Sequence, residues 1–223
     1  MSNLALFDLD GTLIDSSELY FIGVPMIVHE FLNIRVKPSQ FMDLWGQDAK
    51  RWLIRFAEQE ERFSEGLVTE MYAAFERWYS ENHAEYIKYY DGVEQLLAEI
   101  NETGTKIGIV TTRPQQRAEL AFDLSWGAYI DFVVGGDLVK KRKPAPDSID
   151  YAIESNNAES GKHFYLGDNA SDVIAAQNSN YDVTSVGGLW GAERRESLIE
   201  SNPEYLFETV DGFRNWCISN HSV

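Results

Sequence analysis

The sequence is poor in cysteine and in long apolar runs. Its 223 residues include a single cysteine, Cys217, so no disulfide can form within the chain. A chain with one thiol fits a reducing compartment, and we expect a cytoplasmic protein. No apolar run approaches the roughly 18 residues that a membrane-spanning helix needs, so we expect no membrane partner.

Basic residues are scarce beside acidic ones. The 19 Lys and Arg residues against 36 Asp and Glu residues give a formal net charge of −17 at pH 7. Nucleic acids and anionic membranes are bound through basic surfaces, so we expect neither as a partner. An anionic substrate would have to be drawn in by a local positive site. The composition gives no prediction of the oligomeric state.

What the sequence does contain is an alternation of short apolar runs with helical segments. Such alternation indicates βαβ units and a parallel sheet. We therefore expect an α/β fold, a Rossmann-like parallel sheet with helices on both faces. Strands are expected over residues 4–7, 106–112, 132–137, 163–168 and 183–187, and helices over 93–102 and near 115–125, 146–156 and 171–179.

The interval from residue 15 to residue 90 breaks this alternation. Apolar side chains from Leu67 to Tyr79 recur there at spacings of three and four, which is typical of a helix that buries one face. A helix–loop–helix broken at Gly46 precedes them, and Pro25 is expected to start, end or kink a helix. We expect two domains: residues 1–14 with 91–223 form the α/β core, and residues 15–90 form a helical cap.

Polar side chains follow four of the predicted strands. Because the carboxyl ends of parallel strands meet at one edge of a sheet, these side chains can converge. Clustered carboxylates repel one another unless a cation compensates, and carboxylate oxygens suit Mg²⁺. A hydroxyl and a lysine suit a phosphoryl group, so the set predicts a Mg²⁺-phosphate site. The residues are Asp8 and Asp10; Thr111 and Thr112; Lys143; and Asp168 and Asp172.

In this order the residues resemble the four motifs of the haloacid dehalogenase-like (HAD) hydrolase superfamily. Asp8-Leu9-Asp10-Gly11-Thr12 is similar to the first motif, and Thr111 to the second. Lys143 is similar to the third motif, and Gly167–Asp172 to the fourth. The helical insert between the first two motifs resembles the α-helical cap of the phosphoglycolate-phosphatase-like branch.

The resemblance implies a phosphatase that works through an aspartyl-phosphate intermediate. Asp8 would attack phosphorus, while Asp10 would protonate the leaving group and then activate water. Mg²⁺ would be held by the Asp8 carboxylate, the Asp10 backbone carbonyl and Asp168. Asp172 would act nearby, through a water molecule or by fixing Lys143.

The resemblance also assigns residues to the substrate. Thr111 and the backbone amides around Gly11 and Thr112 would bind the phosphoryl oxygens, and Lys143 would screen charge between nucleophile and phosphate. Arg113 stands where relatives often carry a basic residue near the substrate, although a solvent-facing role fits it equally well.

Several alternatives stay open on sequence alone. The substrate, a small phosphorylated metabolite, could be phosphoglycolate-like, a sugar phosphate or a nucleotide, with Gln47, Lys50 and Arg51 of the cap as candidate specificity residues. A phosphosugar mutase of the β-phosphoglucomutase type shares these motifs, and so does a catalytically silent binding module. Asp10 disfavours a dehalogenase, and Lys50 leaves a phosphonate hydrolase as a minor alternative.

Overall fold

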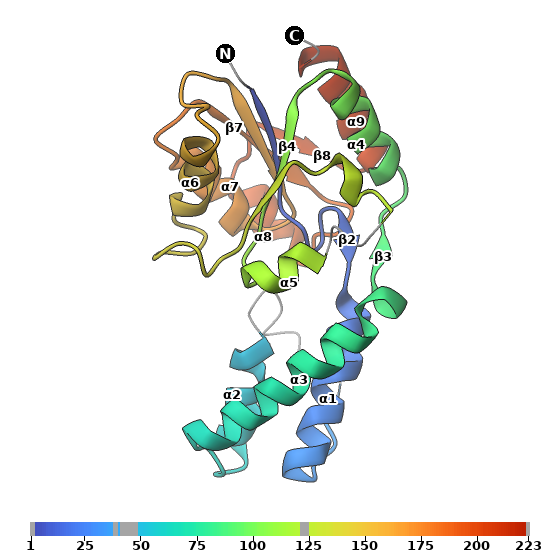
Figure 1. Cartoon of the computed structure of the whole chain (residues 1–223), viewed down its shortest axis with the longest axis vertical. Coiled ribbons are helices and arrows are strands. Elements are labelled where there is room, and N and C mark those ends of the chain that lie inside the picture. The colour runs from blue at the N-terminus through green and yellow to red at the C-terminus, as the bar shows by residue number, and fades with distance from the viewer. Residues whose placement is uncertain (1–2, 38–39, 41–48, 121–124, 222–223) are drawn as a thin grey trace. The chain divides into compact units, whose positions relative to one another are not determined.

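The computed structural model describes residues 3–37, 40, 49–120 and 125–221 (Figure 1). The chain divides into two compact units. One unit consists of Met1–Asp15 and Tyr89–Val223 and contains the large sheet. The other unit, Ser16–Lys88, is helical.

A six-stranded parallel sheet forms the centre of the first unit. The strands follow the order β5-β4-β1-β6-β7-β8, and every neighbouring pair is parallel. β1 is central and all four of its side chains are buried, as an unbroken apolar strand sequence predicts. The strands are β1 (Leu4–Phe7), β4 (Lys106–Val110), β5 (Phe132–Val134), β6 (His163–Gly167), β7 (Val183–Gly188) and β8 (Tyr205–Phe207). A separate two-stranded sheet joins β2 (Ile14–Asp15) to β3 (Lys88–Tyr89).

Helices cover both faces of the large sheet (Figure 1). The faces follow the alternation of side chains along β1. Leu6 lies in a buried cluster with Ile149, whereas Phe7 packs edge-to-face against Phe213, with 6.3 Å between ring centroids. Helices α6 (Asp147–Ser155) and α7 (Ala170–Gln177) lie on one side, and α4 (Val93–Glu102) and α9 (Val210–His221) on the other. This arrangement confirms the predicted α/β fold class.

The register of β1 with its neighbours sets the level of the candidate site. Phe7 lies opposite Ile109 of β4 and Leu166 of β6. The residues that follow these strands therefore emerge at the same edge of the sheet. The backbone extends this pairing by one residue, since the Asp8 amide donates to the Leu166 carbonyl at 2.8 Å.

Most of the predicted elements in this unit are present, and its last part was not predicted. The helix expected over 93–102 has those bounds, and Gly104 follows it with a φ of 77°. The helix expected near 115–125 is α5 (Gln115–Glu119), and residues 121–124 lie outside the described part. The sequence did not predict the 3₁₀ turn Gly127–Tyr129, helix α8 (Arg195–Glu200), β8 or α9.

The second unit is built from α1 (Ser17–Leu32), α2 (Ala49–Gln59) and α3 (Glu65–Tyr86). Helix α3 begins at a cap in which the Ser64 hydroxyl accepts from the Leu67 amide at 3.2 Å. Its buried face includes Met71 and Phe75, as the spacing predicted, and Pro25 lies inside α1. The predicted break at Gly46 and candidate residue Gln47 lie outside the described residues. Within the described ranges, no helix has the length and apolarity needed to cross a membrane.

Candidate active site

The first motif is a tight turn at the end of β1. Asp8 directly follows the strand and is buried, with 7% of its surface exposed. Gly11 has a φ of 77°, a conformation that side chains rarely adopt, and its amide donates to the Ile14 carbonyl at 2.8 Å. A Cβ atom at this position would overlap the Asp168 carboxylate. Glycine is therefore required here both by the turn and by the approach of Asp168.

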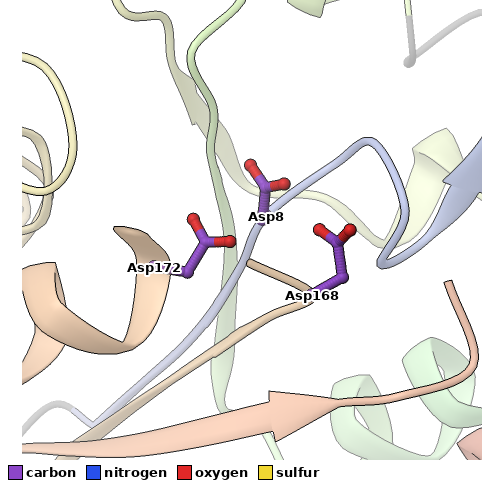
Figure 2. A group of neighbouring side chains, drawn as sticks. All are labelled: Asp8, Asp168 and Asp172. Carbon is purple, nitrogen blue, oxygen red and sulfur yellow. The ribbon is translucent and has the colours of Figure 1, made fainter. Parts of the chain in front are cut away.

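Three carboxylates meet at this edge of the sheet (Figure 2). Oxygens of Asp8, Asp168 and Asp172 all lie within 4.8 Å of one another. Asp168 follows β6, and Asp172 belongs to the first turn of α7. Asp172 is fixed by a capping box, because its Oδ2 accepts from the Asn169 amide at 3.0 Å. The structure thus brings together three of the four predicted metal ligands.

Lys143 enters this group from the loop before α6. Its Nζ lies 2.8 Å from Asp8 Oδ1 and 2.5 Å from Asp172 Oδ1. The side chain is 3% exposed, so the ammonium group is removed from solvent. Removing an ammonium from water costs free energy, which its attraction to carboxylates offsets only where the geometry is good and its protons are hydrogen-bonded. Lys143 therefore compensates part of the negative charge of the three aspartates.

The charges in the cluster do not balance. Burial raises the pKa of Asp8 to about 7; Lys143 opposes this rise and Asp172 adds to it. Burial, together with Asp172 and Asp8, raises the pKa of Asp168 well above its usual range. Burial alone would lower the pKa of Lys143, but Asp172 and Asp8 outweigh it and hold that pKa well above its ordinary value. One cation among three carboxylates leaves an excess of negative charge that a bound cation would offset.

The donor set fits a hard divalent cation. Carboxylate oxygens are the ligands that Mg²⁺ prefers, and it usually takes one or two of them. Asp172 already uses Oδ1 for Lys143 and Oδ2 for the Asn169 amide. Asp8 and Asp168 are therefore the better-placed carboxylates, and Asp172 is better placed to fix Lys143.

Thr111, Arg113 and Asp10 form the adjoining part of the site. The Thr111 hydroxyl accepts from the Arg113 amide at 3.2 Å, and its own amide donates to the Val134 carbonyl. Arg113 is buried and grips the Asp10 carboxylate with two donors, of which Nε lies 2.5 Å from Oδ2. The sequence predicted Arg113 as a substrate contact, whereas in the structure its guanidinium donates to the Asp10 carboxylate. Thr112 lies between Thr111 and Arg113 in the sequence and is half-buried.

Two contributors to the site were missed by sequence reasoning. Tyr165 of β6 points its hydroxyl at Lys143 Nζ, 2.7 Å away, although the strand sequence suggested only a core residue. Trp190 donates its indole N–H to the Thr12 carbonyl at 2.9 Å. The only sequence signal for this contact was the glycine that follows Trp190. In the structure, a Cβ atom at Gly191 would overlap the Gly11 carbonyl, so the backbone here packs directly against the first motif.

The candidate residues of the helical unit are only partly described. Lys50 Nζ lies 5.9 Å from the centroid of the Tyr72 ring, a cation–π arrangement on the surface of this unit. Arg51 is exposed. The role of Lys50 and Arg51 in substrate specificity therefore stays a prediction.

Comparison with known proteins identifies the family. The model of the haloacid dehalogenase-like hydrolase family matches residues 5–186, and the chain belongs to that family. The pyrophosphatase PpaX of Bacillus mycoides (strain KBAB4) is 28% identical over 209 residues, covering 93% of each chain. The prediction of an enzyme, a hydrolase of this family, is confirmed.

Solved structures extend the likeness to the whole chain. A predicted phosphatase from Clostridium acetobutylicum is 27% identical, with a TM-score of 0.79 over 98% of this chain and 99% of that one. A predicted phosphoglycolate phosphatase from Haemophilus somnus 129PT is 19% identical, with a TM-score of 0.85 over 96% and 97%. The second likeness supports the fold alone.

Proposed function

We propose that this chain is a Mg²⁺-dependent phosphatase that removes the phosphoryl group from a small phosphorylated metabolite through an aspartyl-phosphate. The observation that carries the proposal is the position of Asp8. It is a buried carboxylate at the carboxyl end of the central strand, 2.8 Å from Lys143 and within 4.8 Å of Asp168 and Asp172. Family membership supports the same chemistry.

The reaction would proceed in two displacements. In the first, an Asp8 oxygen forms a bond to phosphorus while the bond to the leaving oxygen breaks, and Asp10 gives that oxygen a proton. In the second, water attacks the phosphorus, its proton passes to Asp10, and the bond to Asp8 breaks. Inorganic phosphate is released, and both aspartates return to their starting states. Arg113 donates to both Asp10 oxygens and favours the ionised carboxylate, so it would have to release one oxygen for Asp10 to carry and deliver the transferred proton.

The remaining polar groups would prepare the phosphoryl group for attack. A bound Mg²⁺ would supply charge neutralisation and orient the phosphoryl oxygens, held by the Asp8 and Asp168 carboxylates and the Asp10 carbonyl. Lys143 offsets the charge of Asp8, so that a dianion can approach a carboxylate. Thr111 and the amides of Gly11 and Thr112 would donate hydrogen bonds to the transferring oxygens.

The helical unit is the proposed cap of this enzyme, over residues 15–90. Lys50 and Arg51 remain its candidate specificity residues, since an exposed cation can bind a second anionic group on the substrate. The cytoplasm is the proposed location, supported by the one cysteine of the chain. That residue, Cys217, is buried, and burial raises the pKa of its thiol to about 12, so it is not suited to act as a nucleophile.

A substrate panel tests the proposed function. The purified chain with Mg²⁺ is offered pyrophosphate, 2-phosphoglycolate, hexose phosphates, nucleoside monophosphates and 4-nitrophenyl phosphate, and released phosphate is ranked by kcat/KM. We expect release from at least one natural compound and from the aryl phosphate, with no isomerised sugar phosphate. Isomerisation without phosphate release would identify a mutase, and no turnover on any compound would favour a binding module.

Mg²⁺ is expected to stabilise the protein more at pH 8 than at pH 5. The pKa of Asp8 rises from 3.8 to about 7 on folding. Between these values the folded state binds more protons than the unfolded state, so the free energy of unfolding falls as pH rises. Bound Mg²⁺ would offset this loss of stability. At a concentration of 100 Kd it would add about 2.7 kcal/mol to the free energy of unfolding.

Thermal unfolding at both pH values, with Mg²⁺ and with a chelator, measures this difference. For a chain of this length, the added stability corresponds to a Tm increase of roughly 5–10 °C at pH 8. Asp8→Asn, which removes one of the two proposed carboxylate ligands, should reduce the increase at pH 8. An equal increase at both pH values would contradict the assignment of the metal to these aspartates.

A further inference from the structure

A buried hydroxyl beside Lys143 has no part in the roles assigned so far. It belongs to Tyr165, the third residue of β6, whose side chain is fully buried. Its oxygen lies 2.7 Å from Lys143 Nζ, 2.7 Å from the Val110 carbonyl and 3.3 Å from Asp172 Oδ1. An apolar side chain could fill this core position, and burying a hydroxyl costs free energy unless it forms hydrogen bonds. The partners of the hydroxyl are therefore the place to look for its role.

The direction of each hydrogen bond follows from the chemistry of the partners. A lysine ammonium can only donate, and a carbonyl can only accept. The Tyr165 oxygen therefore accepts a hydrogen bond from Lys143, and its O–H donates one to the Val110 carbonyl. Val110 is the last residue of β4, which lies two strands away from β6 with β1 between them, and Thr111 follows it directly. The Tyr165 hydroxyl therefore links Lys143 to the end of β4.

Tyr165 also completes the set of acceptors around Lys143. The ammonium has three protons, and three side-chain oxygens lie within 2.8 Å of its nitrogen, one each from Asp8, Asp172 and Tyr165. The next oxygen, the Val110 carbonyl, is 3.4 Å away. The two carboxylates attract the ammonium, and the neutral hydroxyl fixes the direction of its third proton.

We propose that Tyr165 is a positioning residue, whose hydroxyl holds Lys143 Nζ in contact with Asp8 and Asp172 together. The proposal rests on the proposed function. Without the hydroxyl, the third proton has a weak acceptor at best, and the ammonium is free to turn toward Asp172, its nearer carboxylate. Asp8 then loses part of the charge compensation it needs when a phosphoryl dianion approaches.

Tyr165→Phe tests the proposal, because it removes one oxygen and keeps the ring. With 4-nitrophenyl phosphate and Mg²⁺, we expect kcat to fall roughly tenfold while KM stays within about twofold, the size of effect one lost hydrogen bond gives. Tyr181→Phe is the matched control, because Tyr181 precedes β7 at the end of the sheet opposite the candidate site and its hydroxyl donates to Glu154 at 2.9 Å. The kcat of this variant should equal that of the wild type.

A double-mutant cycle separates positioning from a merely structural role. If Tyr165 acts through Lys143, then Tyr165→Phe should change the residual kcat less than about twofold in a Lys143→Met background. An equal loss in both backgrounds would overturn the proposal, as would an unchanged kcat of the single variant.

A binding measurement covers the case in which Lys143→Met does not fold or does not turn over. Beryllofluoride with Mg²⁺ mimics a phosphorylated aspartate, and its affinity can be followed by tryptophan fluorescence. Tyr165→Phe should weaken it roughly fivefold relative to the wild type and Tyr181→Phe; equal affinities of all three would overturn the proposal. Turnover by the wild type that Asp8→Asn abolishes establishes the proposed function independently, so failure of either idea is recognisable.

Discussion

Asp8→Asn is expected to lower kcat by roughly 10³-fold or more, because an amide cannot attack phosphorus or form the covalent intermediate. Removing this carboxylate also removes a charge that is buried beside Asp168 and Asp172. The variant should therefore unfold no more easily than the wild type at pH 8 without metal. Steady-state kinetics and thermal unfolding of the same preparation measure both effects.

Asp182→Asn is the matched control for this variant. Asp182 is exposed and precedes β7, at the end of the sheet opposite the candidate site. Its kcat should be unchanged. Activity of Asp8→Asn near the wild-type level would show that another group is the nucleophile, and a low Tm would show that the lost activity reflects unfolding.

Lys143→Met is expected to give the largest loss of stability. It removes the ammonium that contacts Asp8 and Asp172, and breaking a buried ion pair by deleting one partner costs about 3–5 kcal/mol. The loss should shrink at pH 5, where the raised pKa of Asp8 leaves that carboxyl protonated and neutral. We expect kcat to fall by roughly 100-fold or more in the folded protein, since Asp8 and the phosphoryl group would then repel each other.

Urea unfolding at pH 5 and pH 8 measures this dependence. Lys162→Met, an exposed lysine just before β6, should change the free energy of unfolding by about 0.5 kcal/mol or less. A Lys143→Met variant as stable as Lys162→Met at pH 8 would contradict a charge-compensating role.

The elements that the sequence predicted well are those with a regular burial pattern. The helix Val93–Glu102 has Leu96, Leu97 and Ile100 on one face and a glycine two residues past its end, so both its existence and its bounds were predictable. The edge strand Tyr205–Phe207 is short and largely exposed. It carries no buried apolar run, so nothing in its residues distinguished it from a loop.

The convergence of the candidate site was predictable for a related reason. In a parallel sheet, the positions that follow Phe7, Val110 and Gly167 emerge at one edge whatever the side chains do. The side-chain pairings were not predictable. The ion pair of Arg113 with Asp10 and the hydrogen bond of Lys143 with Tyr165 depend on rotamers and on which side chains share a buried space. No pattern of residue spacing in the sequence indicates either contact.

The capping box of α7 ties the chemistry to the folding of one helical turn. One oxygen of Asp172 closes that turn, and the other holds Lys143. Fraying of the first turn of α7 would therefore withdraw the lysine's partner while every strand of the sheet is still paired. If Lys143 has its proposed role, the local stability of the turn at Asn169–Asp172 would limit the fraction of time in which the site is complete, separately from the global stability of the fold.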